Sequence, residues 1–225
     1  DANEVDSSFL RSIREKAKEK LVALTIASND PRKGLGALLQ AYKSLELDVP
    51  NSFLVLHSEP KRYYDREERR YCERYYDLQK LVSDFEIERI WLTNSYGKMS
   101  SSEVNALYGF CQVYVLSSFS EGFGLPILEA FRFNKPVVAV DAPPFNEVIE
   151  DGHTGKLIPY SEVRWLNHKN KMLFKMHIYE PHSLAEAIVS LLSNNCLRES
   201  METQIRERKH RWSIHKLYPR LLDYF

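Results

Sequence analysis

The stretch QVYVLSSFSEGFGLPILEAFRF, residues 112–133, reads as a strand, a turn and a helix in succession. Its first residues are mostly apolar and rich in β-branched and aromatic types, which is typical of a buried strand. Gly122 and Gly124 permit backbone conformations that other residues avoid, so a ligand can approach the main chain closely. Pro126 fits the first turn of a helix, where its missing N–H is tolerated. The stretch therefore predicts a glycine-containing turn that leads into a helix near Leu125.

Two glutamates flank this turn, Glu121 at its mouth and Glu129 inside the helix. Side chains tilt toward the N-terminus of a helix, so Glu129 leans back and both carboxylates can face one pocket. The helix start favours a phosphate, whereas each carboxylate can accept hydrogen bonds from sugar hydroxyls. A phosphate between two hydroxyl-bearing rings describes a nucleotide sugar. On spacing alone, a solvated turn residue and a helix-start charge explain the two glutamates equally well.

Short apolar runs alternate with helical patterns along the chain. Runs that are apolar throughout suit strands covered on both faces, and such strands form parallel sheets. We therefore predict repeated βα units and a doubly wound α/β fold, whose ligands bind outside the carboxyl ends of the strands. The predicted strands are 21–28, 52–58, 89–94, 112–118, 136–141 and 155–159; the predicted helices are 34–47, 65–84, 102–109, 125–133 and 145–150, followed by two or three amphipathic helices from 181 onward.

Composition excludes several classes of protein. Lys plus Arg and Asp plus Glu number 31 each, so no global basic field suggests nucleic acid. Cys72, Cys111 and Cys196 are widely spaced, which favours reduced thiols over a disulfide frame or a zinc site. No apolar run approaches the length of a transmembrane helix, and the first residues lack the pattern of a signal peptide. We expect a cytoplasmic protein that holds no metal.

Two segments stand apart from this alternation. Residues 61–80, KRYYDREERRYCERYYDLQK, combine dense charge with tyrosines and predict a long exposed helix, with a partner surface as the alternative. Residues 160–179, YSEVRWLNHKNKMLFKMHIY, lie between the last strand and the next helix. We interpret them as an insertion that packs on the domain, with contact to a neighbouring chain as the alternative.

The stretches SEGFGLPILEA and NKPVVAVDAPPFNEVIEDGHTGKLIP together resemble a known family. They are similar to the C-terminal, donor-binding domain of retaining GT-B glycosyltransferases of the family-4 type, also called glycosyl transferases group 1. That family carries two glutamates separated by seven residues, matched here by Glu121 and Glu129, and a later DG-x-TG pattern. EVDSSFL and RWSIHKLYPRLLDYF extend the resemblance to nearly the whole chain. It implies a six-stranded Rossmann-like sheet in a single domain over residues 1–225, one lobe of a two-lobed enzyme without its N-terminal acceptor lobe.

The resemblance also implies roles for individual residues. Glu121 would contact the hydroxyls of the donor sugar, and Glu129 would contact the ribose. PRKGLGALLQAY resembles the family's KG segment, so Lys33 would pair with the diphosphate and, with Glu121, carry the catalysis. Tyr96 lies where the family commonly holds the base. The backbone N–H groups that would meet the sugar or the diphosphate belong to Gly122, Phe123, Gly124 and Leu125.

The chain departs from the family at two places. The family generally has an arginine just after the first strand, where residues 27–29 of this chain read Ala, Ser and Asn. Arg32, on the other side of Pro31, is the candidate substitute; without it, diphosphate binding depends on Lys33 and the helix dipole. The glycine-rich turn usual after the second strand is replaced by residues 58–60, Ser-Glu-Pro.

The resemblance thus predicts a retaining, metal-independent transfer of a hexosyl group from a nucleotide-diphosphate sugar, most simply UDP- or GDP-linked, without a further cofactor. Because the acceptor lobe is missing, we expect this chain alone to bind the donor but to turn over negligibly. Two alternatives stay open. One is a non-catalytic nucleotide-sugar-binding or interaction domain of the same fold, and the other is a different GT-B enzyme such as a sugar-nucleotide epimerase.

Overall fold

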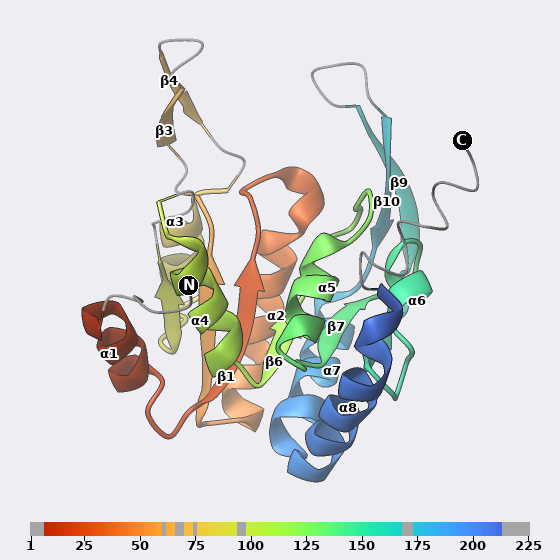
Figure 1. The fold of residues 1–225 in the computed structure, drawn as a ribbon. Coiled ribbons are helices and arrows are strands. Elements are labelled where there is room, and N and C mark those ends of the chain that lie inside the picture. The colour runs from red at the N-terminus through yellow and green to blue at the C-terminus, as the bar shows by residue number, and fades with distance from the viewer. Residues whose placement is uncertain are drawn as a thin grey trace.

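The computed structural model describes residues 7–59, 62–65, 70–73, 76–93, 98–167 and 173–212. Strands and helices alternate over most of this length (Figure 1). The elements are α1 (Ser7–Lys16), β1 (Leu21–Ile26), the 3₁₀ turn η1 (Pro31–Lys33), α2 (Leu35–Asp48), β2 (Ser52–His57), β3 (Arg62–Asp65), β4 (Arg70–Glu73), α3 (Leu78–Asp84), β5 (Ile90–Leu92), α4 (Ser101–Phe110), β6 (Val113–Val115), α5 (Leu125–Arg132), β7 (Val137–Val140), α6 (Phe145–Val148), β8 (Gly155–Ile158), β9 (Glu162–Asn167), β10 (Leu173–Ile178), α7 (Pro181–Ser193), α8 (Asn195–Arg208) and the 3₁₀ turn η2 (Lys209–Trp212).

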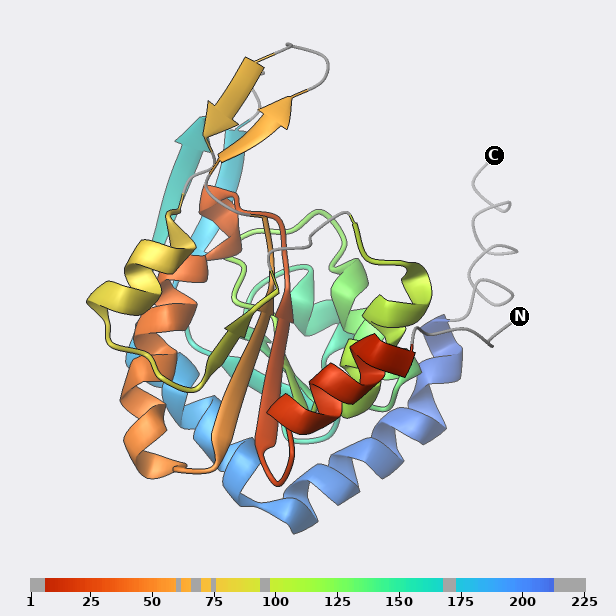
Figure 2. The same ribbon diagram turned by 90° about the vertical axis from the view of Figure 1, so that its left-hand side faces the viewer.

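A six-stranded sheet forms the centre of the molecule, in the order β5-β2-β1-β6-β7-β8. Every neighbouring pair in it is parallel. Helices cover both faces: α2, α3 and α7 lie on one side, whereas α1, α4 and α5 lie on the other (Figures 1 and 2). The sequence prediction of a doubly wound, Rossmann-like parallel sheet of six strands is therefore confirmed.

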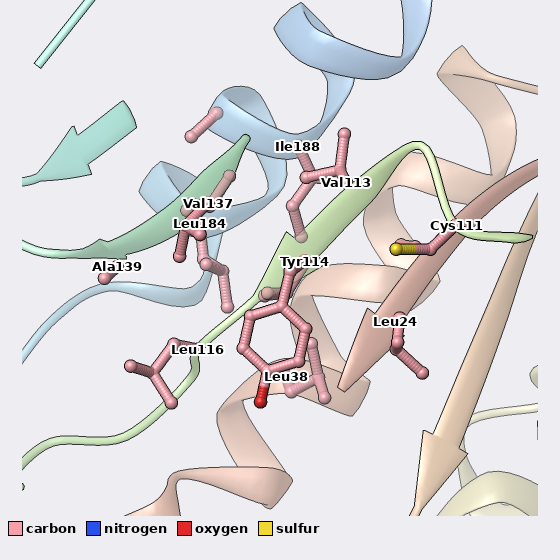
Figure 3. Packing of buried hydrophobic residues seen from close by; sticks show 14 of the residues in the cluster. Leu24, Leu38, Cys111, Val113, Tyr114, Leu116, Val137, Ala139, Leu184 and Ile188 are labelled. Carbon is pink, nitrogen blue, oxygen red and sulfur yellow. The ribbon is translucent and has the colours of Figure 1, made fainter. Parts of the chain in front are cut away.

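Apolar side chains fill the space between the sheet and its helices. The three residues of β6 and the four of β7 are buried, as expected for strands covered on both faces. Figure 3 shows Leu184 and Ile188 of α7 beside Val113 and Val137 of the sheet. Burial of each such side chain contributes roughly 1.5–3 kcal/mol, so the central strands hold the two helical layers at fixed positions.

The direction of the chain across the sheet reverses between β1 and β6. From β1 the strand order proceeds through β2 to β5 on one side and through β6 to β8 on the other. At such a switch point the loops that follow the two neighbouring strands diverge and leave a crevice outside their carboxyl ends. Residues 27–34 follow β1 and residues 116–124 follow β6, so these two loops border that crevice.

The two loops meet at Gly34. Its φ of 62° lies in the left-handed region that favours glycine, and a Cβ there would come within 2.1 Å of the carbonyl oxygen of Ser117. The Ser117 hydroxyl donates to the carbonyl oxygen of Lys33 at 2.8 Å, and the Phe119 N–H donates to that of Arg32 at 2.7 Å. These contacts fix the position of the segment 31–34 relative to residues 116–124, the loop that carries Glu121 and is called the glutamate loop below.

The prediction of a long helix within residues 61–84 is wrong. β3 and β4 pair in an antiparallel hairpin, and among the residues of this segment that the structure describes, the helical ones belong to α3. The register places Arg62 opposite Glu73 and Asp65 opposite Arg70. Oppositely charged residues at facing positions and a high content of tyrosine both favour paired strands, which the sequence argument did not weigh.

Within the segment 160–179, β9 and β10 pair as a second antiparallel hairpin. It extends beyond the carboxyl end of the main sheet, on the other side of the crevice from the β3–β4 hairpin (Figure 1). His177 at its base is buried, whereas Trp165 and Leu173 are 60% and 59% exposed. The hairpin therefore packs on the domain at its base and leaves other side chains exposed.

Two cysteines can be placed, and neither is in a disulfide: Cys111 is buried and Cys196 is exposed. The side chain of Cys72 lies outside the described residues. Within the described ranges, none of the helices has the length and apolar content needed to cross a bilayer.

The close approach at Gly34 can be tested by stability measurements. Gly34→Ala should lower the free energy of unfolding by about 2 kcal/mol or more, because it adds both a strained φ and an overlap with Ser117. Gly109→Ala is the matched control. Gly109 lies in α4 with nothing within 4 Å of its Cβ position, so alanine there should stabilise by about 0.5–1 kcal/mol. Urea unfolding measures both, and equal effects would contradict the assigned contact.

Candidate functional site

A cavity of about 560 Å3 opens in the crevice beside the start of α5. Its volume lies within the ~300–1,000 Å3 that is usual for small-molecule sites. The walls combine three charged side chains with apolar groups. The lining residues are Ile26, Ala27, Ser28, Lys33, His57, Met99, Val104, Glu121, Phe123, Gly124, Leu125, Pro126 and Glu129.

The N-terminus of α5 forms one wall of this cavity. Gly124 precedes the helix with a φ of 80°, in the left-handed region that favours glycine. No side chain caps this helix end, so the positive end of the helix dipole remains available to an anion. Gly122 has no positive φ and nothing near its Cβ position, so the argument for a special backbone conformation holds at Gly124 only.

Glu121 is the most heavily contacted acid of the site. Lys33 Nζ lies 2.5 Å from its Oε1, and the Ser118 hydroxyl donates to the same oxygen at 2.7 Å. Arg32 Nη1 lies 3.8 Å from its Oε2. The side chains of Glu121 and Lys33 are 9% and 12% exposed. Weak exposure to solvent strengthens the attraction between these charges and orients the carboxylate.

Arg32 lies next to this pair but does not line the cavity. Its guanidinium contacts Asp30 at 3.4 Å, between Nε and Oδ1, in addition to Glu121. Its Cζ also lies 5.1 Å from the centre of the Phe174 ring of β10. The candidate substitute for the missing arginine is therefore held beside Glu121.

Residues 27–29 contribute no charge at the position of the missing arginine. Ala27 and Ser28 line the cavity, whereas Asn29 is 1% exposed. The side chain of Asn29 pairs with the backbone of Tyr76: its Nδ2 donates to the Tyr76 carbonyl at 2.7 Å and its Oδ1 accepts from the Tyr76 N–H at 2.9 Å. Its own N–H donates to Glu59 Oε2 at 2.6 Å. Asn29 thus has a structural role.

Glu129 is the second acid of the cavity and is exposed at its rim. The hydroxyl of Tyr108 in α4 donates to its Oε2 at 2.7 Å. Tyr108 is 1% exposed and its ring stacks on that of Phe133, with centroids 5.6 Å apart. Burial raises the pKa of the Tyr108 hydroxyl, which keeps it a hydrogen-bond donor at neutral pH. One oxygen of Glu129 is therefore fixed on the protein side.

A smaller cavity of about 320 Å3 continues from the first between α4 and α5. The two share Met99, Val104 and Glu129 in their walls. The smaller one adds the polar groups of Asn105 and Arg132. The connected space therefore extends along α5 past Glu129.

His57 enters the larger cavity from the carboxyl end of β2. Its Nδ1 lies 2.6 Å from the hydroxyl of Thr93, and burial lowers its pKa from 6.5 to about 4. The ring is consequently neutral at pH 7 and adds no positive charge to the site.

The structure brings most of the predicted site residues together. Lys33, Glu121, Glu129 and the segment 123–125 line one cavity, although their roles stay predictions. Arg32 and Gly122 adjoin it without lining it, and Tyr96 lies outside the described residues. The residues that sequence reasoning missed include Ser118 and Tyr108, which hold the two glutamates. Only Ser118, three positions before Glu121, carried a local signal.

A model of the family described as glycosyl transferases group 1 matches residues 6–208. The chain belongs to this family. The match covers both predicted glutamates, the PRKG segment and all six strands of the sheet.

Individual glycosyltransferases are similar to this group 1 chain. An uncharacterized glycosyltransferase of Sulfolobus islandicus rod-shaped virus 1 is 30% identical over 129 residues, which are 57% of this chain and 38% of the viral protein. The crystal structure of Anabaena HepE in complex with UDP and glucose matches with a TM-score of 0.72 at 17% identity, over 99% of this chain and 53% of HepE. The C-terminal domain of a glycosyl transferase group 1 family protein from Francisella tularensis gives a TM-score of 0.61 at 19% identity, over 91% of this chain and 90% of that domain.

These likenesses show the fold, and they show how much of each relative's length this chain covers. The chain spans 38% of the length of its viral relative and about half of HepE. At the identities of the solved structures, the agreement shows the fold alone, a Rossmann-like domain of the kind found in GT-B glycosyltransferases. Within the described residues, no cluster of three or more His, Cys, Asp or Glu side chains could hold a metal ion.

The low pKa of His57 predicts a pH dependence of stability in this group 1 domain. Above pH 6.5 His57 is neutral in both states and has no effect. Below pH 6.5 the unfolded chain takes up a proton that the folded chain, with a pKa of about 4, does not. The free energy of unfolding should therefore fall between pH 6.5 and 4, by about 2 kcal/mol at pH 5.

His57→Asn should remove this part of the pH dependence. The test is urea unfolding of both proteins at pH 7.5 and pH 5, with each protein's value at pH 7.5 as its own reference. Equal losses in the two proteins would show that the ring is protonated in the folded state as readily as in the unfolded one.

Proposed function

We propose that the chain is the donor-binding lobe of a retaining glycosyltransferase that transfers a hexosyl group from a nucleotide-diphosphate sugar to an acceptor. One observation carries the proposal: a single cavity at the switch point of the sheet contains Lys33, Glu121, Glu129 and the uncapped start of α5. The cation and the helix end suit a diphosphate, and the two carboxylates suit the hydroxyl-bearing rings on either side of it. Membership of the glycosyl transferases group 1 family supports the same class of donor.

The diphosphate binds at the start of α5. There the helix dipole, the N–H groups near Gly124 and the ammonium of Lys33 act on the same anion. When the bond to the anomeric carbon breaks, negative charge develops on the leaving diphosphate. Groups held in advance around that charge lower the barrier to transfer, and no metal ion is required for this step.

Lys33 changes partners when the donor binds. Its ammonium is paired with Glu121 at 2.5 Å, and an arriving diphosphate competes for the same charge. Arg32 and Ser118 remain as partners of Glu121 while Lys33 turns to the phosphates. The Oε1 atom that Lys33 leaves then accepts hydrogen bonds from hydroxyls of the donor sugar.

Glu129 binds the ribose through one oxygen. Because Oε2 accepts the hydroxyl of Tyr108, Oε1 is the atom available to the ribose hydroxyls. Glu129 lies one turn along α5 from the proposed diphosphate position. This distance of roughly 5–6 Å matches the separation of ribose and diphosphate in a nucleotide. The smaller cavity beyond Glu129 leaves room on the side away from the phosphates.

The acceptor approaches from a second lobe across the crevice. The chain matches about half of HepE, whose structure contains UDP and glucose. With one lobe, the domain binds and orients the donor, and transfer by this chain alone is negligible. The competing function is a non-catalytic nucleotide-sugar-binding domain, which the structural use of Asn29 at the place of the family arginine favours.

A nucleotide screen tests the proposal against this alternative and against loss of binding altogether. Thermal-shift and calorimetric titrations with UDP, GDP and ADP, each with and without a sugar, should find one stabilising nucleotide. For that nucleotide, Lys33→Ala should lose roughly 1.5–3 kcal/mol of binding free energy, about 10- to 150-fold in Kd. Lys20→Ala, at the opposite end of β1, is the control. Unchanged affinity in Lys33→Ala would remove this lysine from the site.

The two glutamates should separate the two ends of the donor. Glu129→Ala should weaken the bare nucleotide and the nucleotide sugar alike, because the ribose is common to both. Glu121→Ala should weaken the nucleotide sugar alone, by about fivefold or more. Glu207→Ala, an exposed helical glutamate of α8, is the control. Calorimetry that finds the same pattern of losses for Glu121→Ala and Glu129→Ala would refute this division.

A further inference from the structure

The β9–β10 hairpin reaches the candidate donor site from a distant part of the sequence. Phe174 of β10 lies with its ring centre 5.1 Å from Cζ of Arg32, across 142 positions of sequence. The register pairs Phe174 with Leu166 and Lys175 with Trp165. Successive residues of a strand point to opposite faces, so Phe174 is on the face toward Arg32 and Trp165 is on the other.

The base of the hairpin is hydrogen-bonded to the glutamate loop. The N–H of His177 donates to the carbonyl oxygen of Phe119 at 2.8 Å, and the N–H of Phe119 donates to that of Arg32 at 2.7 Å. The hydroxyl of Tyr179 donates to the carbonyl oxygen of Ser117 at 2.6 Å. Hairpin, glutamate loop and η1 therefore form one connected unit, in which Phe119 is the central residue.

Among the residues that the structure describes, Asp30, Glu121 and Phe174 contact the guanidinium of Arg32. Its guanidinium lies between Asp30 and Glu121, and its side chain is 25% exposed. The ring of Phe174 contacts the guanidinium in addition, and a cation over an aromatic face is attracted by the ring quadrupole. A long arginine side chain loses rotational freedom when it is fixed, so a flat surface that holds it favours the orientation seen here.

We propose that Phe174 is a positioning residue of the donor site: it holds Arg32 against Glu121, so that Glu121 keeps a cationic partner when Lys33 turns to the diphosphate. This inference rests on the proposed function. It makes the hairpin part of the site and assigns it an effect on the sugar end of the donor, since Glu121 is the residue that binds the sugar. In this chain Arg32 therefore supports the carboxylate instead of replacing the family arginine at the phosphates.

Five variants test the role of Phe174. Phe174→Leu keeps an apolar side chain but removes the ring, and Phe174→Tyr keeps the ring. Trp165→Leu is the matched control on the opposite face of the same hairpin, where the residue is 60% exposed. Arg32→Ala, alone and combined with Phe174→Leu, shows whether the two residues act through one another.

Calorimetry with UDP-glucose, GDP-mannose and ADP-glucose, and with the three bare nucleotides, gives the first readout. Phe174→Leu should bind the preferred nucleotide sugar about two- to fivefold more weakly, with the bare nucleotide unchanged. Phe174→Tyr and Trp165→Leu should bind both as the wild type does. In the Arg32→Ala background, Phe174→Leu should cause no further loss. If Phe174 had only a general structural role, Phe174→Leu would weaken the binding of both ligands, and this loss would also be found in the Arg32→Ala background.

The Nε–Hε resonance of Arg32 gives a second readout that needs no nucleotide. Phe174→Leu should shift this resonance, because the ring current is lost, and should speed its exchange with water; Phe174→Tyr and Trp165→Leu should leave it in place. If Phe174→Leu left the resonance or the affinity for the nucleotide sugar unchanged, the role of Phe174 would be refuted, but the proposed function would not. A wild-type protein that binds none of the six compounds would refute the proposed function, and the role of Phe174 in donor binding with it.

Discussion

The contact between Gly34 and the backbone of Ser117 is the constraint on which the site depends. The loops after β1 and β6 come together there because the direction of the chain across the sheet reverses between these two strands. A side chain at position 34 would separate them, whereas glycine lets the hydrogen bonds of Ser117 and Phe119 close onto the segment 31–34. Lys33 and Glu121, 88 positions apart, meet as a consequence. The site is therefore a product of sheet topology first and of side-chain chemistry second.

The charges that meet at this point are arranged to be displaced. A weakly exposed ion pair costs desolvation that its attraction only partly returns, so it is poor evidence for stability. Lys33 and Glu121 are such a pair, but Glu121 also has Ser118 and Arg32. A carboxylate with several partners tolerates the loss of one, because the others still compensate its charge and hydrogen-bond its oxygens. Because one cation lies at Oε1 and another at Oε2, Glu121 would keep a cationic partner if Lys33 turned to a ligand, as proposed for the donor.

The sheet and the start of α5 could be predicted from the sequence because each is encoded locally. Six apolar runs, together with the glycines and Pro126 before α5, carry their own signal within a few residues. The β3–β4 hairpin could not be predicted from the sequence. A segment rich in charge and tyrosine is compatible with both helix and strand patterns, and the register of the two strands depends on how they pair. In the site, the spacing of Glu121 and Glu129 predicted that both carboxylates could face one pocket, and both line the same cavity. Their partners Arg32 and Tyr108 act through the folded arrangement of loops and helices, which spacing does not contain.

The departure from the family pattern after β1 has a physical counterpart in the fold. Where the family generally has arginine, Asn29 is buried, and its amide pairs with both backbone groups of Tyr76 as a second strand would. An arginine could not make this pair of bonds, because it has no acceptor to receive the Tyr76 N–H. The asparagine therefore fixes the start of the α3 region to the end of β1 and leaves the positive charge to be supplied from elsewhere. Arg32, on the other side of Pro31, lies instead beside Glu121 and against the ring of Phe174. The end of β1 is therefore held by the amide of Asn29, and the cation nearest to that residue in sequence, Arg32, is held between the carboxylate of Glu121 and the β9–β10 hairpin.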